Sequence, residues 1–553
     1  MSNDSAVLPG RLAGPGRRIR RALTLAIALL AAATATADAT PRPTVDVQLL
    51  SISDWHAQLD PMSVSGVGDV GGAAVLSSYF HRERADNPNT LTLTAGDAFG
   101  ASPPLSGQFD EEPAVRAMNL MGFDADALGN HNFDRGVAHL RSMTELAEFP
   151  YLAANLRNAV TELPLVKPYE IFEVGGVKVA VIGITNPEAP TLVKPGNFGS
   201  IEPTDPVPAA NKARARAKQQ GAQVFVAITH MGVTSFDPAT GEPRGPLVDF
   251  AENVGGFDVI LGDHTDIQYS GVINGALVVE NRSKGLTYAR TTLAVDPRNG
   301  RVADRRVQFV TPLARTVTPD PAVVDMLAPY RAMLAERFDQ PMGVASDVFP
   351  RGGNVERLRE VALGNLVADA MRERYGTQIA LTNGGGLRAA LPSSYLPADR
   401  SLRRASPGYA PGPPYDLVMG DAFTVLPFGN TVVTRTVSGQ QLYGALELSV
   451  SALPAANGRF LQISGFRFAY DQSRPAGSRV VWADLADGTP ILRDSTPYTV
   501  ALPDFVNAGG DGYTMFADGA GITREVMADV LLDHVRARGT IAPVVDGRIT
   551  RVG

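Results

Sequence analysis

The sequence has 553 residues, of which 44% are hydrophobic and 19% charged, so it can bury more than one core and is not disordered by composition. Its formal net charge of -7 argues against a nucleic-acid partner, because such partners require a basic face. The absence of cysteine excludes disulfide bonds, a lipid-modified cysteine anchor and thiolate metal ligands. Any metal ion must therefore be held by oxygen atoms and imidazole rings.

Residues 1–39 have the pattern of a secretory signal peptide. Arginines at positions 17, 18, 20 and 21 precede the apolar run 22–33, and small residues follow in "TATADAT". The paired arginines also leave open an export route for folded proteins. No other apolar run is long enough to span a membrane. We therefore expect a protein without a stable membrane anchor, in the periplasm or outside the cell.

Polar side chains follow the carboxyl ends of five predicted strands. The strands and the polar residues after them are "VDVQLLSIS" with Asp54 and His56, "NTLTLTAG" with Asp97, "FDADALG" with Asn130 and His131, "AQVFVAIT" with His230, and "FDVILG" with Asp263, His264 and Asp266. Any one of these motifs alone is more typical of a surface turn. Open α/β sheets place their active sites at the carboxyl ends of strands, so five such motifs together predict one.

The motifs "DWH", "GDAFGAS", "GNHNFD", "THMG" and "GDHTD" resemble, in this order, the blocks of the calcineurin-like metallophosphoesterases. More narrowly, they resemble the secreted bacterial 5'-nucleotidase and UDP-sugar hydrolase family. The resemblance implies an α/β fold in which an N-terminal four-layer αββα metallophosphoesterase domain (40–315) is joined by a linker helix (316–344) to a C-terminal α/β substrate-binding domain (345–553).

The resemblance also implies a site for two divalent metal ions, whose identity (Mn, Zn, Mg or Ca) stays open. The positions that match the family's ligands are Asp54, His56 and Asp266 for the first ion, Asn130, His230 and His264 for the second, and Asp97 as the bridge between them. Two cations about 3.5 to 4 Å apart can clamp the oxygens of an in-line displacement and supply a metal-bound hydroxide near neutral pH.

Asp266 departs from the family pattern, which usually has a histidine or glutamine at this position. As a direct ligand, which we favour, its carboxylate would shift the first site toward Mn²⁺, Mg²⁺ or Ca²⁺. The alternative is a hydrogen bond to a water molecule that fills the coordination position. Ala57 and Asn132 also differ from the usual glycine and acidic residue, but neither belongs to the ligand set.

His131 has a different role in the family pattern, although it stands directly after a ligand. The resemblance implies that its imidazole faces the phosphoryl group, stabilises developing charge and protonates the leaving oxygen. Asp134 would orient that imidazole.

A domain boundary is expected near "TPLARTVTPDP". Asp320 is a plausible N-cap and Pro321 lies in the first turn of a helix that should run to about Phe338. This helix is expected to bridge the two domains and to act as a hinge, and Pro329 is expected to kink or break it.

The second half of the chain carries a further set of motifs: "RLRE", "LGNLVADA", "NGGGLR", "LPFGN", "GRFLQISGFRFAYD" and "DFVNAGGDGY". Together they resemble the C-terminal substrate-specificity domain of the 5'-nucleotidases, although "NGGG" alone is typical of any strand-to-helix loop. A glycine-rich turn such as the one after Asn383 exposes backbone N–H groups to an anion. The resemblance implies phosphate binding by Arg357 and Arg388, nucleobase stacking between Phe428 and Phe505, a base contact from Asn430 and ribose binding by Asp511.

These expectations describe an exported metal-dependent hydrolase that removes phosphate from a small-molecule nucleotide. UDP-sugars, nucleoside diphosphates and 2',3'-cyclic nucleotides remain possible substrates. The alternatives are a thiosulfohydrolase-like relative, since "HAQL" at 56–59 is similar, or a nucleotide-binding surface protein with impaired catalysis. The sequence does not define the preferred nucleotide or the oligomeric state. The Pro-, Gly- and Arg-rich segment 397–416 is longer than the family loop and is expected to be exposed, without an assigned role.

Overall fold

The computed structural model describes residues 44–64 and 66–553, so the predicted signal peptide lies outside the described residues. Within this part of the chain, no helix combines the length and apolar character needed to cross a membrane. Residues 45–553 belong to one unit of the fold.

The first six-stranded sheet carries three of the predicted strands. Its order is β18 (Arg301–Val310), β17 (Tyr288–Asp296), β1 (Val45–Ile52), β4 (Thr90–Thr94), β5 (Ala125–Ala127) and β6 (Tyr151–Leu152). Strands β1, β4, β5 and β6 run parallel, while β17 and β18 are antiparallel additions at one edge. The carboxyl ends of β1, β4 and β5 therefore lie at the same end of the sheet.

The second six-stranded sheet carries the other two predicted strands. Its order is β15 (Tyr269–Ile273), β16 (Ala276–Glu280), β14 (Val259–Gly262), β11 (Val224–Thr229), β9 (Val177–Ile184) and β8 (Tyr169–Val174). The four central strands are parallel, and β8 and β15 are antiparallel edges. Strand β11 is buried at every residue, as expected for a parallel strand covered on both faces.

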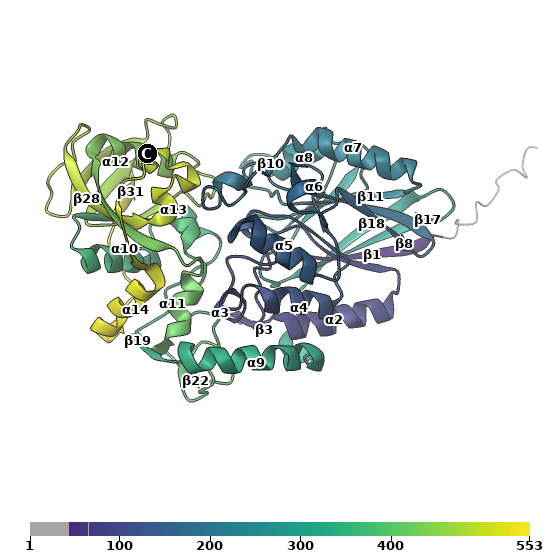
Figure 1. The fold of residues 1–553 in the computed structure, drawn as a ribbon, viewed down its shortest axis with the longest axis horizontal. Helices are drawn as coiled ribbons and strands as arrows, with labels where there is room; N and C mark the ends of the chain where they lie inside the picture. Colours follow the sequence, from purple (N-terminus) through teal and green to yellow (C-terminus); the bar gives the residue numbers. More distant parts are fainter. Residues whose placement is uncertain (1–43, 65) are drawn as a thin grey trace, which may run out of the picture. The chain divides into compact units, whose positions relative to one another are not determined.

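These two sheets form the middle of a four-layer αββα arrangement. Aliphatic side chains of both sheets, among them Val47, Leu93, Val181 and Val226, form one buried core. Helices α2 (Ala73–Asp86), α4 (Glu112–Met121) and α5 (Gly136–Leu146) belong to the core beside the first sheet, and α7 (Pro206–Gln219) and α8 (Pro246–Asn253) to that of the second (Figure 1). The predicted layering is confirmed, and we call residues 45–310 the N-terminal lobe.

Helix α9 (Pro321–Phe338) is the predicted linker helix. It begins where expected, because the side chain of its N-cap Asp320 accepts a hydrogen bond from the backbone N–H of Ala322 at 3.0 Å. It lies beside α2 and α4, and near its other end Phe338 packs edge-on against Phe423 at 5.1 Å (Figure 1). The helix runs through Pro329, so the expectation of a break is wrong. A proline removes one backbone hydrogen bond, and packing on both sides of that position keeps the helix together.

The C-terminal lobe, by which we mean residues 341–551, is built around a five-stranded sheet. Its order is β25 (Leu461–Ser464), β20 (Ile379–Asn383), β28 (Pro497–Pro503), β24 (Thr431–Ser438) and β29 (Ile522–Val526). The helices packed with it are α10 (Ala362–Tyr375), α12 (Gly439–Val450) and α14 (Met527–Arg538). The lobe also contains two three-stranded sheets and one two-stranded sheet. The strands are β23 (Tyr415–Val418), β19 (Pro341–Ala345) and β30 (Thr540–Ile541) in the first, β27 (Val480–Leu485), β26 (Phe466–Tyr470) and β31 (Ile549–Arg551) in the second, and β21 (Arg403–Arg404) and β22 (Ala410–Pro411) in the third.

The segment 397–416 is only partly the exposed loop that its composition suggests. Half of its residues are exposed, but Pro397 and Arg404 are buried, and Arg404 forms an ion pair with the buried Asp421 of α11 (Met419–Val425). The same guanidinium donates to the carbonyl oxygens of Ser393, Tyr395 and Asp416 at 2.8 to 3.3 Å. The segment is therefore anchored in the C-terminal lobe by the buried side chain of Arg404.

Candidate active site

All seven predicted metal ligands lie just after the carboxyl ends of five parallel strands. Asp54 and His56 follow β1, Asp97 follows β4 and Asn130 follows β5 in the first sheet. In the second sheet His230 follows β11, and His264 and Asp266 follow β14. The two sheets thus deliver these side chains to one region, where three groups of side chains place their ligand atoms within 4.8 Å of one another: His56, Asp97 and His131; Asp97, His230 and His264; and Asp54, His230 and Asp263.

The backbone at these strand ends is strained. Positive φ angles of 40°, 49°, 51°, 88° and 60° occur at Asp54, His56, Asp97, His264 and Asp266, which are five of the seven predicted ligands. Non-glycine residues seldom adopt this region, and such residues cluster at functional sites. The turn is also tight, since a Cβ at Gly129 would lie 2.2 Å from Oδ1 of Asp97. The strained backbone thus supports the prediction that these turns form a functional site.

The imidazole of His230 is the centre of the tightest cluster. Its Nε2 lies 2.9 Å from Oδ2 of Asp97, 3.1 Å from Oδ1 of Asn130 and 3.1 Å from Nδ1 of His264. One imidazole N–H can donate to only one of these three atoms. Oδ2 of Asp97 is buried and, despite its short contact with His230, makes no well-aligned hydrogen bond within residues 44–64 and 66–553.

Two of the predicted histidine ligands, His56 and His230, contact a backbone carbonyl through Nδ1 of the ring. Nδ1 of His56 donates to the carbonyl of Gly100 at 2.8 Å, and Nδ1 of His230 donates to the carbonyl of Ala95 at 3.2 Å. A backbone acceptor at Nδ1 directs the lone pair of Nε2 toward the site, which is how metal-bound histidines are usually held; in this structure Nε2 of His56 accepts a hydrogen bond from Nη2 of Arg388 at 2.8 Å. The ring orientations, together with the acceptor atoms that crowd Nε2 of His230, fit a divalent cation.

The electrostatics of the cluster depend on burial. Burial alone would raise the pKa of Asp97, but His230 and His131 hold it well below its usual range. Burial alone would lower the pKa of His230, whereas Asp97 outweighs burial and raises it to about 9. Burial also raises the pKa of Asp54 to about 6 and, together with His230, lowers that of His264 to about 3. The cluster therefore favours one cationic charge next to Asp97, the position that a metal ion can take.

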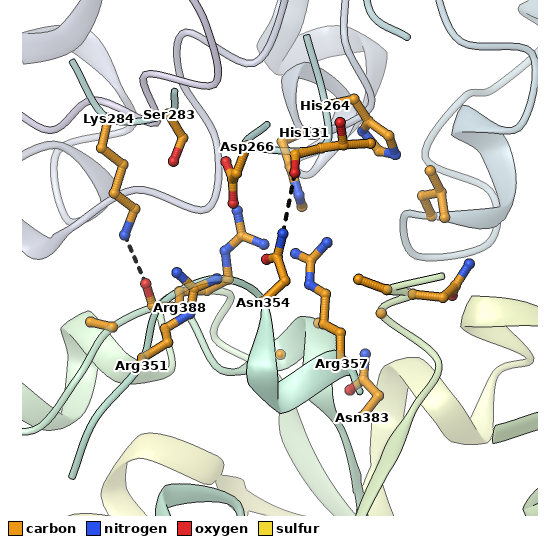
Figure 2. Close-up of a pocket in the computed structure, with 18 of the residues that line it drawn as sticks. His131, His264, Asp266, Ser283, Lys284, Arg351, Asn354, Arg357, Asn383 and Arg388 are labelled. Carbon is orange, nitrogen blue, oxygen red and sulfur yellow. Dashed lines mark hydrogen bonds between the residues drawn. The ribbon is translucent and has the colours of Figure 1, made fainter. Parts of the chain in front are cut away.

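Asp266 stands apart from the three groups of converging ligand atoms. Its burial would raise its pKa, but Arg351 and Arg357 of the C-terminal lobe outweigh this effect and lower it. The pKa of Asp54 is in turn raised in part by the nearby charge of Asp266. Asp266 thus lies in the part of the cavity where the arginines of the C-terminal lobe gather (Figure 2).

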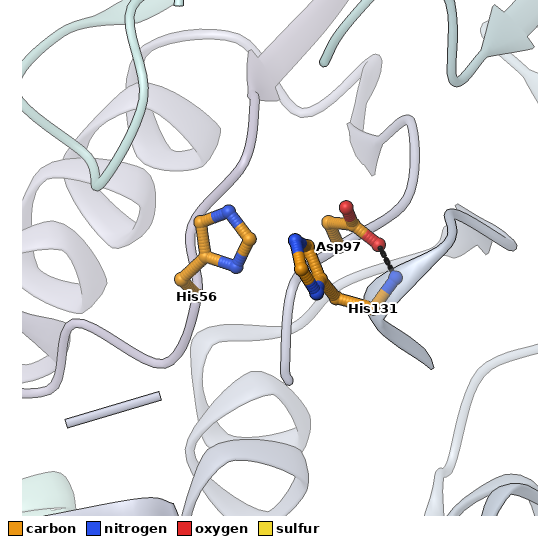
Figure 3. Close-up of side chains that lie close together, drawn as sticks. All are labelled: His56, Asp97 and His131. Atoms are coloured by element: carbon orange, nitrogen blue, oxygen red, sulfur yellow. Dashed lines mark hydrogen bonds between the residues drawn. The ribbon is translucent and has the colours of Figure 1, made fainter. Parts of the chain in front are cut away.

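His131 is held at three points. Its backbone N–H donates to Oδ1 of Asp97 at 2.7 Å (Figure 3), and its Nδ1 lies 3.0 and 3.1 Å from the two carboxylate oxygens of Asp134. Its ring stacks on Phe428 of the C-terminal lobe, with centroids 5.4 Å apart and planes 22° apart. The contacts of Nδ1 leave Nε2 as the ring atom for a substrate.

A cavity of about 940 Å³ lies over the cluster and is lined by both lobes (Figure 2). This volume is at the upper end of the range for small-molecule sites. Of the predicted site residues, those that line it are Asn130, His131, Asp134, His264, Asp266, Arg357, Asn383, Arg388, Phe428, Asn430, Phe505 and Asp511. Every predicted substrate-binding residue therefore lines this cavity. Three of the predicted metal ligands, Asn130, His264 and Asp266, line the same cavity.

The C-terminal lobe brings two guanidinium groups to this cavity. The Nε atoms of Arg357 and Arg388 are buried and have no hydrogen-bond partner among the described residues, although Nε of Arg357 lies 3.9 Å from Oε1 of Glu356. Nη2 of Arg388 donates to Nε2 of His56 at 2.8 Å, so this side chain reaches the predicted ligands of the first ion. Arg351, a third arginine, also lines the cavity.

The nucleoside-binding residues gather at another part of the cavity wall. Nδ2 of Asn383 donates to Oδ2 of Asp511 at 2.7 Å, and both residues are buried. Burial raises the pKa of Asp511, although its hydrogen bond with Asn383 opposes the shift. The rings of Phe428 and Phe505 line the same cavity.

Sequence reasoning missed several cavity residues. Ser283 and Lys284 line the cavity and follow β16, so the same strand-end rule would have found them. Asn354 also lines it, but no local pattern marks this residue. Burial, together with the coulombic effect of Arg351 and Arg388, lowers the pKa of Lys284 to about 7.

Comparison with known proteins supports this assignment. The sequence model of the family "5'-nucleotidase, C-terminal domain" matches residues 341–518. The chain is 28% identical to the endonuclease YhcR of Bacillus subtilis over 485 residues, which are 84% of this chain but 37% of that protein. It is also 28% identical to the snake venom 5'-nucleotidase of Gloydius brevicauda over 553 residues, covering 91% of this chain and 88% of the relative.

A solved structure extends the likeness to the whole fold. The 5'-nucleotidase precursor from Thermus thermophilus matches with a TM-score of 0.81 and 29% sequence identity, over 92% of this chain and 99% of that chain. The chain therefore spans little more than a third of YhcR but nearly all of this solved relative. With its two-lobed fold, its strand-end site and these relatives, the chain is similar to the 5'-nucleotidases, and its residues 341–518 match the C-terminal domain of that family.

Proposed function

We propose that this chain is an exported phosphohydrolase that removes phosphate from nucleotides with the help of two divalent cations. The observation that carries the proposal is the composition of one cavity, which predicted metal ligands, arginines and two phenylalanine rings line together. A nucleotide offers a matching phosphate, sugar and base.

The residues that would hold the cations are Asp54, His56 and Asp266 for the first, Asn130, His230 and His264 for the second, and Asp97 for both. When bound, the cations would neutralise charge on the phosphoryl oxygens and acidify a water molecule for attack on phosphorus. The ring orientations of His56 and His230, both held by backbone carbonyls, support this assignment. Three carboxylates at the first site favour Mn²⁺, Mg²⁺ or Ca²⁺ there over Zn²⁺.

Arg357 and Arg388 bind the substrate phosphate in this proposal. Their unpartnered Nε atoms support it, because a buried guanidinium nitrogen without an acceptor is costly unless a ligand supplies one. Phe428 and Phe505 stack on the base and Asp511, held by Asn383, accepts hydrogen bonds from ribose hydroxyls. Asn430 contributes a further contact to the base.

His131 stabilises the phosphoryl group and donates a proton to the leaving oxygen. Its two contacts with the carboxylate of Asp134 support this role, since they orient the ring and leave Nε2 for the substrate. The hydrogen bond from its backbone to Asp97 ties the ring to the bridging carboxylate.

Residues 1–39 act as the export signal in this proposal, residues 40–315 as the catalytic domain, 316–344 as the linker and 345–553 as the nucleotide-binding domain. The arginine-led apolar segment at the start of the sequence supports export. The family match over 341–518 supports the last boundary.

The test is an activity panel on purified protein with AMP, ADP, UDP-glucose and 2',3'-cyclic AMP. Each substrate is measured before chelation, after chelation and after Mn²⁺ is added back. We expect phosphate release from a nucleotide, loss on chelation and recovery with Mn²⁺. No hydrolysis of any nucleotide with Mn²⁺ present would overturn the proposal, and binding without hydrolysis would instead indicate a nucleotide-binding protein.

A further inference from the structure

Lys284 connects the two lobes through the backbones of two predicted functional residues. Its own backbone N–H donates to the carbonyl of Asp54 at 2.9 Å in the N-terminal lobe. Its Nζ donates to the carbonyl of Arg388 at 2.7 Å in the C-terminal lobe (Figure 2). One residue thus links a predicted metal ligand to a predicted phosphate-binding arginine.

The backbone of Lys284 adopts an unfavourable conformation to make this link. Its φ of 59° lies in the left-handed region, which lysine seldom adopts. The following residue, Gly285, has a φ of 68°, and a Cβ there would lie 2.8 Å from Cδ1 of Leu76. The surrounding packing therefore holds the turn in a shape that directs the lysine toward the other lobe.

Arg388 is the residue whose position depends on this contact. Its backbone N–H donates to Val425 at 2.9 Å, and its carbonyl accepts from Lys284. From there the buried side chain extends to His56 at 2.8 Å and lies 5.8 Å from the ring centre of Phe428. A shift of the Arg388 backbone would therefore move the guanidinium away from the centre of the site.

Asn354 makes a similar connection in the opposite direction. Its Nδ2 donates to the carbonyl of Thr265 at 3.2 Å, and Thr265 stands between His264 and Asp266 (Figure 2). Asn354 also has a left-handed φ, of 54°. Each lobe thus contributes a side chain that donates to a backbone carbonyl of the other lobe. Lys284 donates to the carbonyl of Arg388 itself, and Asn354 donates to the carbonyl of Thr265, the residue between His264 and Asp266.

We propose that Lys284 is a positioning residue that holds Arg388 within reach of the substrate phosphate. Together with Asn354, it makes phosphate binding depend on the arrangement of the two lobes. This inference rests on the proposed function, because it takes Arg388 as a phosphate-binding residue.

The first test compares Lys284→Met with Lys284→Arg in the full chain. Lys284→Met removes the donor and keeps a side chain of similar length. We expect it to raise the inhibition constant of inorganic phosphate and the KM for AMP about tenfold, the scale for losing a charged hydrogen-bond donor, with a smaller change in kcat. Lys284→Arg should restore phosphate affinity, because it restores a donor.

Two controls separate this role from a structural one. Bound Mn²⁺, measured by mass spectrometry, should be the same in Lys284→Met as in the unmodified protein. Lys218→Met, which changes an exposed lysine of α7, should change neither constant. Asn354→Ala removes the second connection and therefore tests separately whether phosphate affinity depends on the arrangement of the lobes; if Lys284→Met does not fold, Lys284→Gln, whose side chain is shorter, replaces it in the test of the contact with Arg388.

The second test measures the distance between the lobes. The sequence has no cysteine, so spin labels on introduced Lys218→Cys and Ala476→Cys, both at exposed positions, report without background. The distance distribution is measured by electron–electron double resonance. We expect Lys284→Met and Asn354→Ala each to broaden this distribution. Inorganic phosphate should narrow the distribution less in these two variants than in the unmodified protein.

The inference is overturned if Lys284→Met leaves both the phosphate inhibition constant and the distance distribution unchanged. Loss of the proposed function would look different. In that case the unmodified protein would hydrolyse no nucleotide, while a broader distribution in Lys284→Met would still support the connection between the lobes.

Discussion

The imidazole of His131 stacks on the ring of Phe428, with centroids 5.4 Å apart, although the two residues belong to different lobes. The predicted acid of the reaction and one of the predicted base-stacking rings are therefore in contact. A change in Phe428 should for this reason affect both substrate binding and the chemical step.

We predict that Phe428→Ala and Phe505→Ala differ in a measurable way. Each should raise the KM for AMP by about 5- to 150-fold, since stacking on one ring contributes about 1 to 3 kcal/mol per base. Only Phe428→Ala should also lower kcat for p-nitrophenyl phosphate, which has no base, because it removes the support of His131. Steady-state kinetics with both substrates check this, and identical profiles for the two variants would contradict it.

His131→Ala and Asp97→Asn should fail for different reasons. His131→Ala should keep its bound metal and lower kcat by about 10²- to 10⁴-fold, the usual scale for losing a positioned acid. Asp97→Asn should lose metal, because it neutralises the carboxylate that faces His230 at 2.9 Å. Metal content and kcat measured on the same samples decide the matter, and the opposite pattern would reverse the two roles.

Removal of metal should lower the thermal stability of the protein. A cation that binds the folded state at about 100 times its Kd stabilises it by about 2.7 kcal/mol. Scanning fluorimetry should therefore show a lower Tm after chelation and recovery with Mn²⁺. Asp97→Asn is the matched control, because its Tm should respond to neither treatment.

Asp421→Ala should destabilise the C-terminal lobe strongly. It leaves the guanidinium of Arg404 buried without its charge partner, and breaking a buried pair in this way costs about 3 to 5 kcal/mol. Arg403→Ala breaks the neighbouring, more exposed pair with Asp416 and should shift the urea midpoint far less, because water screens this pair. Urea unfolding of both variants checks the difference, and equal midpoints would show that Arg404 does not anchor the segment.

Local sequence pattern was sufficient for the strands that carry the site. The apolar runs before Asp54, Asp97 and His230 predict strands, and these become β1, β4 and β11. Parallel strands of one sheet end on the same side, so this rule also brings Asp54 and Asp97 together, whereas His230 comes from the second sheet and its place beside them depends on how the two sheets pack. Likewise, Asp320 and Pro321 mark the start of the linker helix, because capping is a local interaction.

Contacts between distant segments were decided only by the tertiary structure. Pro329 should have broken its helix by local rules, but packing against α2, α4 and α11 on both sides of it keeps the helix continuous. The composition around Arg404 predicts an exposed loop, but in the structure Arg404 is buried in an ion pair with Asp421, which lies outside the segment 397–416 that the prediction used.

The sequence by itself determined which residue types stand at the strand ends and therefore the kind of chemistry that this protein can support. Only the tertiary structure decided that Lys284 and Asn354 connect the lobes, and that Arg388 reaches His56. The physical reason is range. Strand periodicity and helix caps depend on neighbours along the chain, whereas these contacts depend on how the two lobes pack against each other.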